Sequence, residues 1–442
     1  MLHDVGREDG AADRRKSNSD IPKEYVPHIH IKLGHYLTFV TDYAVAEAEG
    51  PEEMFRIVLE LPDNTPGKAD LLDVCGSGFR KIFIVNTNQK EDIDNCVLAY
   101  ESAVHLTPQG HLDMSGRLNN LGISYRSRFE CTGDLADISN AISYLQKAVH
   151  LTPEGHADMP NYLSNLGTSF RSCFERTGDH ADISNAISYQ QKAAHLTPEG
   201  HADMPSYLNN LGNSLQSCFE LTGDLADISN AISYKQKAVH LTPEGHENMP
   251  MRLNNLGISF QSRFKLTGDL ADISNAILYK QKAVHLTPEG HAKMPSYLIN
   301  LGNSFHSCFE RTGDLADISN ALLYQQKAVH LTPESHANMP SWLNNLGISF
   351  QSCFERTGDL ADISNAISYK QKAVHLTPEG HAKMPSQLDN LGISFRSHFE
   401  LTGDLADISN AISYQQKAVH LTPEGHTDMP SRLNNLGNSF QS

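Results

Sequence analysis

The chain has 442 residues, 20% of them charged, and its formal net charge is −17. This acidic balance argues against nucleic acid, which is held mainly by Lys and Arg on phosphates, and against an anionic membrane surface. The sequence contains neither the apolar core of a signal peptide nor a run of 18 apolar residues. We therefore expect a cytoplasmic protein without a nucleic-acid or membrane partner.

The seven cysteines show no pairing pattern. Four of them occupy the same place in a repeated segment: Cys173, Cys218, Cys308 and Cys353. Stacked copies of that segment would lie about 10 Å apart, beyond the reach of a disulfide. We expect all seven to be buried or half-buried thiols of a reducing compartment.

The N-terminal part shows only faint regularity. Residues 1–21 are polar and mixed in charge, and we expect a disordered tail. Residues 22–68 are predicted to be a degenerate helical region, in which Leu33-Gly34 marks the start of a worn repeat and residues 51–61 form its second helix.

The next segment, residues 69–114, is a degenerate copy of the repeat that makes up most of the chain. Residues 57–76 align without gaps with residues 103–122, at an offset of 46. Gly76 therefore stands where Gly122 stands in the later copy. End copies of a repeat array are expected to be atypical, because one of their sides faces water.

Residues 115–429 comprise seven near-identical repeats of 45 residues. A Leu-Gly pair marks each copy and the start of an eighth, with glycines at Gly122, Gly167, Gly212, Gly257, Gly302, Gly347, Gly392 and Gly437. Self-similarity at a fixed period in this range indicates a solenoid.

The copy at 205–249 shows what one repeat folds into. A first helix is predicted from about Pro205 to Leu221, with an apolar stripe at helical spacing. Gly223 supplies the left-handed residue that ends it, and Asp224 can cap the second helix. Pro243 and Gly245 end that helix.

No part of the repeat has the two-residue alternation of a strand. One helix pair cannot bury both of its apolar stripes, whereas stacked pairs can. The sequence therefore predicts an all-α fold, an α-solenoid. Residues 430–442 stop inside a first helix, and we expect this truncated helix to belong to a fragment of a longer protein rather than to be a cap.

The Leu-Gly pair, the aromatic residue after it (Phe170, Phe260 or Phe350), Ala231 and Pro243 resemble the tetratricopeptide signature. The resemblance implies a right-handed superhelix of antiparallel helix pairs that binds protein or peptide partners. The repeat is longer than the usual 34 residues of the family, with Lys or Gln where the family has a large aromatic in the second helix. We expect the adjacent tyrosine, Tyr234 in this copy, to fill that space.

The amino-acid sequence of the repeat is similar to the repeats of large arrays in mushroom-forming fungi, which often precede a caspase-like CHAT peptidase domain. It is more distantly similar to the repeats of the kinesin light chain array. One alternative function is therefore a regulatory or sensor array of a larger fungal signalling protein, and another is a spacer without a ligand. The sequence has no nucleophile elbow and no phosphate-binding loop, so we expect no enzyme.

An asparagine column precedes the Leu-Gly pairs. On a helical wheel these side chains lie opposite the apolar stripe, and an amide can pair with a peptide backbone as donor and acceptor. Superhelical tetratricopeptide proteins are similar in using an asparagine ladder here. The alternative is that the amides bond only within the fold or to water. The column comprises Asn120, Asn165, Asn210, Asn255, Asn300, Asn345, Asn390 and Asn435.

Neighbouring positions complete the predicted concave groove, which we expect to be mostly uncharged with a few cations and to bind an extended peptide. They are Asn213, Asn303, Arg126, Arg171 and Arg396. Two histidine columns begin at His105 and His111. No Cys or carboxylate pattern completes a metal site beside them, so we expect no metal and no cofactor.

Overall fold

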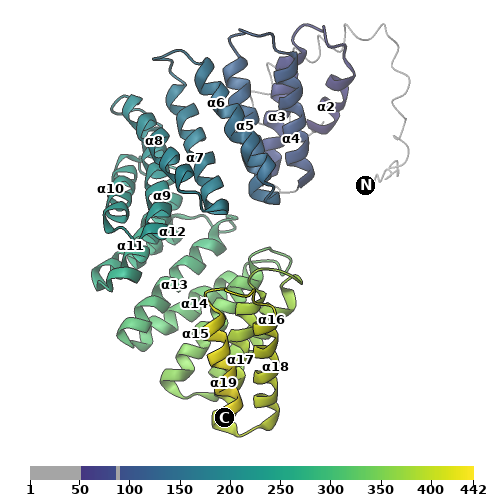
Figure 1. Ribbon diagram of the computed structural model, residues 1–442. Helices are drawn as coiled ribbons and strands as arrows, with labels where there is room; N and C mark the ends of the chain where they lie inside the picture. Colours follow the sequence, from purple (N-terminus) through teal and green to yellow (C-terminus); the bar gives the residue numbers. More distant parts are fainter. Residues whose placement is uncertain (1–50, 86–89) are drawn as a thin grey trace, which may run out of the picture. The chain divides into compact units, whose positions relative to one another are not determined.

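The computed structural model describes residues 51–85 and 90–442, and every regular element in these ranges is an α-helix (Figure 1). The described residues form 18 helices, α2 to α19. The all-α fold class is confirmed. The predicted tail and the Leu33-Gly34 pair lie outside the described residues.

Each repeat contributes a first and a second helix. The first helices are α3 (Lys68–Val85), α5 (Met114–Thr132), α7 (Met159–Thr177), α9 (Met204–Thr222), α11 (Met249–Thr267), α13 (Met294–Thr312), α15 (Met339–Thr357), α17 (Met384–Thr402) and α19 (Met429–Gln441). The second helices are α4 (Lys90–Leu106), α6 (Leu135–Leu151), α8 (His180–Leu196), α10 (Leu225–Leu241), α12 (Leu270–Leu286), α14 (Leu315–His330), α16 (Leu360–Leu376) and α18 (Leu405–His420), and α2 (Pro51–Glu60) precedes α3. The chain divides into two compact bodies, which end and begin at Asp137 and Ile138.

The turn between the two helices follows from three residues. Gly223 has φ +72°, and its N–H donates to the carbonyl of Phe219 at 2.7 Å. Asp224 caps α10, since its carboxylate accepts from the N–H of Ala226 at 2.8 Å. Thr222 Oγ1 accepts in turn from the N–H of Asp224 at 3.2 Å. The predicted left-handed glycine and N-cap are therefore present.

Replacing the cap is expected to weaken the helix. Asp224→Ala removes the acceptor of an otherwise unpaired helix N–H, so the free energy of unfolding should fall by about 1 kcal/mol in a urea titration. Asp203 stands at the equivalent place before α9 but makes no side-chain cap bond. Asp203→Ala is thus the matched control, with an expected change below about 0.5 kcal/mol. Equal losses in the two variants would contradict the capping role.

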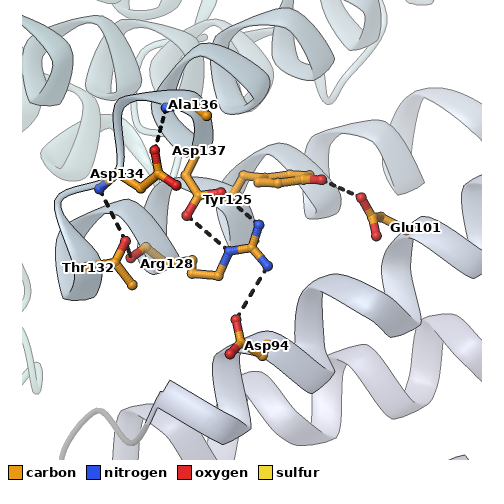
Figure 2. Close-up of polar contacts among 8 residues, drawn as sticks. All are labelled: Asp94, Glu101, Tyr125, Arg128, Thr132, Asp134, Ala136 and Asp137. Atoms are coloured by element: carbon orange, nitrogen blue, oxygen red, sulfur yellow. Dashed lines mark hydrogen bonds and ion pairs between the residues drawn. The ribbon is translucent and has the colours of Figure 1, made fainter.

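Figure 2 shows the same turn between α5 and α6, where an arginine adds a second connection. Arg128 donates to both carboxylate oxygens of Asp137, at 3.0 and 2.7 Å, and contacts Asp94 of α4 at 3.3 Å. Tyr125 donates to Glu101 beside it. Arg128 therefore ties the start of α6 to α4 and α5.

The same position holds a basic residue again three and six repeats later, at Arg263 and His398, which bind Asp272 and Asp407. In the repeats between, a half-buried cysteine stands there without a disulfide. The expectation for the thiols is wrong at Cys131, which is exposed because it lies in the last turn of α5.

Within the second body the core continues from one repeat into the next. In the second body, Leu211, Leu215 and Ile228 pack in one cluster with Leu256 and Phe260 of the following repeat. Each second helix from α8 to α18 thus packs between two first helices, its own and the next. Burial of both apolar stripes by stacking is what the repeat pattern predicts.

The Leu-Gly pair marks the closest approach of the two helices of a repeat. A Cβ added at Gly212 would lie 2.7 Å from Cγ of Lys235 and 3.1 Å from the backbone oxygen of Ala231. Lys235 itself is buried, with 1% of its surface exposed. The prediction that tyrosine fills this place is therefore wrong: the tyrosines are only partly buried and stack on a phenylalanine, as Tyr279 does on Phe260 at 5.7 Å.

Candidate functional site

Successive first helices of the second body, α7 to α19, contact one another as well as the second helices. Each first helix from α9 to α17 is therefore enclosed on most sides and leaves one narrow strip open. In α9 this strip comprises Ser206, Asn210, Asn213, Gln216 and Glu220, which are half-buried or exposed. We call this strip and its equivalents in the other first helices the first-helix face.

The asparagine column lies on the first-helix face, half-buried in every repeat. The amide N–H of Asn255 donates to Oδ1 of Asn209 at 3.3 Å, and that of Asn300 donates to Asn254 at 3.2 Å. The acceptor is always the residue just before the column in the preceding repeat. Further bonds of this type join Asn120 to Asp73, Asn210 to Ser164, Asn390 to Asn344 and Asn435 to Asp389.

Asn165 donates to Asn161 of its own helix at 2.7 Å. Asn345 has Ile299 in place of the acceptor, so its amide makes no such bond to the preceding repeat. The bond between repeats occupies one amide hydrogen and fixes the orientation of the amide in Asn120, Asn210, Asn255, Asn300, Asn390 and Asn435.

The carbonyl oxygens of three members of the column remain available. Oδ1 of Asn210, Asn255 and Asn300 accepts no hydrogen bond from the described part of the chain, and none of these atoms is among the fully buried ones. These oxygens therefore reach solvent in fixed orientations. An oriented, accessible acceptor can take an N–H group of a ligand.

The remaining predicted residues are less available. Asn213 is half-buried on the same face. Asn303 accepts from Gln325 Nε2 at 2.9 Å through its side chain and from Gln261 Nε2 at 3.3 Å through its backbone oxygen. Its amide is therefore engaged in holding neighbouring helices.

The predicted cations of the face are paired with glutamates one turn further along the same helix. Arg126 lies 3.5 Å from Glu130, and Arg396 lies 3.4 Å from Glu400. Arg171 pairs with Glu175 in the same way.

Where the cation is replaced by glutamine, as at Gln216, the amide donates to Glu220 at 2.9 Å. The expectation of a mostly uncharged groove with a few cations therefore needs correction: the face carries a row of carboxylates. Since each glutamate follows its partner by four residues, the pattern was readable in the sequence.

Sequence reasoning missed a set of buried lysines behind this face. Lys235 Nζ donates to Gln216 Oε1 at 2.7 Å, to Ser259 Oγ at 2.8 Å and to the backbone oxygen of Asn255 at 3.4 Å. The pKa of Lys235 is lowered to about 7, mainly because burial penalises the charge; the nearby Arg171 also lowers it, and Glu220 raises it.

Burial lowers the pKa of Lys280 and of Lys370 to about 7 as well. Their polar contacts repeat those of Lys235. The sequence signal that could have revealed these lysines is a correlation between two repeat positions, that of Lys235 in the second helix and that of Gln216 in the first. At this place in the second helix, lysine occurs only where glutamine stands 19 residues earlier.

The histidine column that begins at His111 has a local structural role. In each copy Nδ1 accepts the backbone N–H two residues later, at 3.1 to 3.3 Å, as His246 does from Asn248. Within the described ranges no group of three His, Cys, Asp or Glu side chains is placed to hold a metal ion. None of the described helices has the length and apolar character needed to cross a membrane.

No protein-family model and no curated protein matches the chain. Among solved structures it is similar to the apo form of RapI, with 14% identity over 89% of this chain and 97% of that one and a TM-score of 0.47. It is also similar to the apo quorum sensor NprR from B. thuringiensis, with 10% identity over 83% and 96% of the chains and a TM-score of 0.47.

The C-terminal part of a TPR repeat-containing protein from Cytophaga hutchinsonii shares 15% identity over 71% of this chain and 99% of that one, with a TM-score of 0.42. The class of the present protein is defined by its own packing. Consecutive helix pairs at a 45-residue period form a tetratricopeptide-like α-solenoid.

Proposed function

We propose that this protein is a non-enzymatic scaffold that binds an extended peptide segment along the first-helix face through the asparagine column. The observation that supports the proposal is the row of accessible Oδ1 atoms of Asn210, Asn255 and Asn300. Each is held in place by a hydrogen bond from its own amide N–H to the preceding repeat. Packed helices lie about 8–10 Å apart, and an extended chain rises about 3.3 Å per residue. One repeat therefore corresponds to about three peptide residues, so backbone N–H groups can meet the column at regular intervals.

The charge of the face favours a particular kind of peptide. Glutamates such as Glu220 and Glu355 follow the face at one per repeat, and the only cation in that column of the described repeats is Lys265. The chain as a whole carries a formal charge of −17. Since complementary charges speed encounter and suppress wrong partners, we expect the peptide to carry Lys or Arg rather than Asp or Glu.

A displayed library of random 12-residue peptides tests the proposal directly, with the whole chain as bait. Selected peptides are measured against a variant with Asn210, Asn255, Asn300 and Asn345 changed to Ala. Loss of four backbone hydrogen bonds should weaken binding at least about 30-fold. The matched control changes Asn230, Asn275, Asn320 and Asn365, which lie on the second helices of the same repeats, and should leave the affinity unchanged.

An unchanged affinity in the column variant, with its helical circular dichroism intact, would refute the proposal, as would an equal loss in the control. If the variant with four substitutions loses its helicity, the single substitution Asn345→Ala replaces it in the test. Its amide makes no bond to the preceding repeat, so this substitution removes no hydrogen bond between repeats. We expect it to weaken binding about fivefold while leaving the thermal transition in place.

A further inference from the structure

The buried polar side chains between consecutive repeats of the second body form two kinds of joint. In a lysine joint, Lys235 of α10 binds Gln216 of its own repeat and Ser259 of the next. Ser259 also donates to Gln216 at 2.5 Å. Three side chains from α9, α10 and α11 are thus closed into one cluster. Lys280 and Lys370 build the same cluster with Gln261 and Ser304, and with Gln351 and Ser394.

In a glutamine joint the lysine is replaced and the cluster is open. Both amide atoms of Gln190 and Gln415 are buried without a hydrogen-bond partner in the described part of the chain. Gln325 bonds only Asn303 of its own repeat. The serine hydroxyls of the following first helices, Ser214, Ser349 and Ser439, are buried and equally unpartnered. These glutamines and serines therefore make no hydrogen bond across a glutamine joint, where the one such contact of the neighbouring basic side chains in the described ranges is that of His306 with Ser352 at 3.1 Å.

The two columns change together along the chain. Lys235, Lys280 and Lys370 occur with glutamine in the first helix, whereas Gln190, Gln325 and Gln415 occur with Arg171, His306 and Arg396. Each of these repeats therefore holds one basic side chain at the joint, in one of two places. Two cations there would repel each other in a medium of low dielectric constant. The two kinds of joint therefore differ in which of two positions, that of Gln216 or that of Lys235, holds the basic side chain.

We propose that the array opens first at its glutamine joints, so that α9–α14 and α15–α18 behave as clamped segments separated by a weak joint. The buried residue before the recurring Leu of the first helix varies, but it does not follow the two kinds of joint: tyrosine stands at a glutamine joint in Tyr207 and at a lysine joint in Tyr297. The polar cluster does follow them. In a repeat array the interface between neighbours decides where cooperativity breaks. Buried polar atoms without partners favour the opened state, in which water can reach them.

Native-state hydrogen exchange of the whole chain, followed by mass spectrometry, tests the inference. The repeats serve as one another's controls, because their intrinsic exchange rates are nearly equal. Amides of α9 and α15, which follow glutamine joints, should exchange at least about fivefold faster than those of α11 and α13, which follow lysine joints. Equal protection in the four helices would overturn the proposal.

Exchanging the pairs makes the test specific. Arg171→Gln with Gln190→Lys should close the joint before α9, since Ser214 is already in place. Gln216→Arg with Lys235→Gln should open the joint before α11. Both double variants install pairs that the chain already contains, so both should keep the wild-type helicity. Protection is expected to rise in α9 and fall in α11, and protection that does not follow the exchanged pairs would contradict the proposal.

Discussion

Gly212→Ala is expected to lower the free energy of unfolding by about 2–3 kcal/mol, although alanine is the better helix former. The added Cβ would lie 2.7 Å from the Lys235 side chain and 3.1 Å from the backbone oxygen of Ala231. The lysine stem can shift, but the carbonyl belongs to the backbone of α10. The two helices must therefore separate, which loosens the packing of Leu211 and Ile228 around the crossing.

Gly437 provides a matched control within the same column. A Cβ added there meets no atom within 4 Å. Gly437→Ala should therefore be neutral, or stabilising by up to about 1 kcal/mol, because only helix propensity changes. Urea titrations of both variants separate the effects. A Gly212→Ala variant as stable as the wild type would show that the Leu-Gly pair does not set the helix crossing.

Raising the pH from 7 to 9 is expected to stabilise the array. Lys235, Lys280 and Lys370 each have a folded-state pKa of about 7, well below their ordinary value, because burial penalises the charge. In this window the unfolded chain binds more protons than the folded one, so the free energy of unfolding rises with pH. The gain should be roughly 2 kcal/mol per lysine between pH 7 and 9, and it levels off below pH 7.

The charges that face these lysines differ from repeat to repeat. Arg171 lowers and Glu220 raises the pKa of Lys235, while Lys265 lowers that of Lys280 and Glu355 raises that of Lys370. Burial is the largest cause in all three cases, so the direction of the pH effect is the same. Cysteines and tyrosines also titrate in alkaline solution, which makes a comparison between variants necessary.

Urea midpoints at pH 7 and 9 measure the effect. A variant in which all three lysines and their partner glutamines are exchanged for Gln and Arg should lose most of the rise. The control changes Lys237, Lys282 and Lys372, exposed lysines two residues further along the same helices, to Gln and should keep it. A rise that survives in the first variant would show that other groups produce it.

The helices and their turns were predictable because each boundary depends on local chemistry. Helix α9 begins at Met204, one residue before the predicted Pro205. The left-handed Gly223 and the cap at Asp224 act within four residues of one another, so a single repeat contains all the information they need. The side of the helix on which Asn210 lies also follows from helical periodicity alone.

The partners of these side chains were not predictable in the same way. Asn255 bonds Asn209, which stands 46 residues earlier, and that pairing depends on how two repeats stack. The place of Lys235 was missed because a lysine is rarely buried, and the tyrosine beside it is the more ordinary core residue. Its stem passes over Gly212, and its ammonium group reaches three acceptors at the joint. Only the coupled change of two columns, compared across the repeats, signals this arrangement.

Photo-cross-linking of a selected peptide tests the central claim most directly. A photoreactive residue is placed on the first-helix face at Ser206 or Asn213, and in separate variants on the second helix at Asn230 or Ser233. The account predicts that the peptide is captured from Ser206 and Asn213 and not from Asn230 and Ser233. Capture from the second-helix positions, with none from the first-helix face, would contradict it.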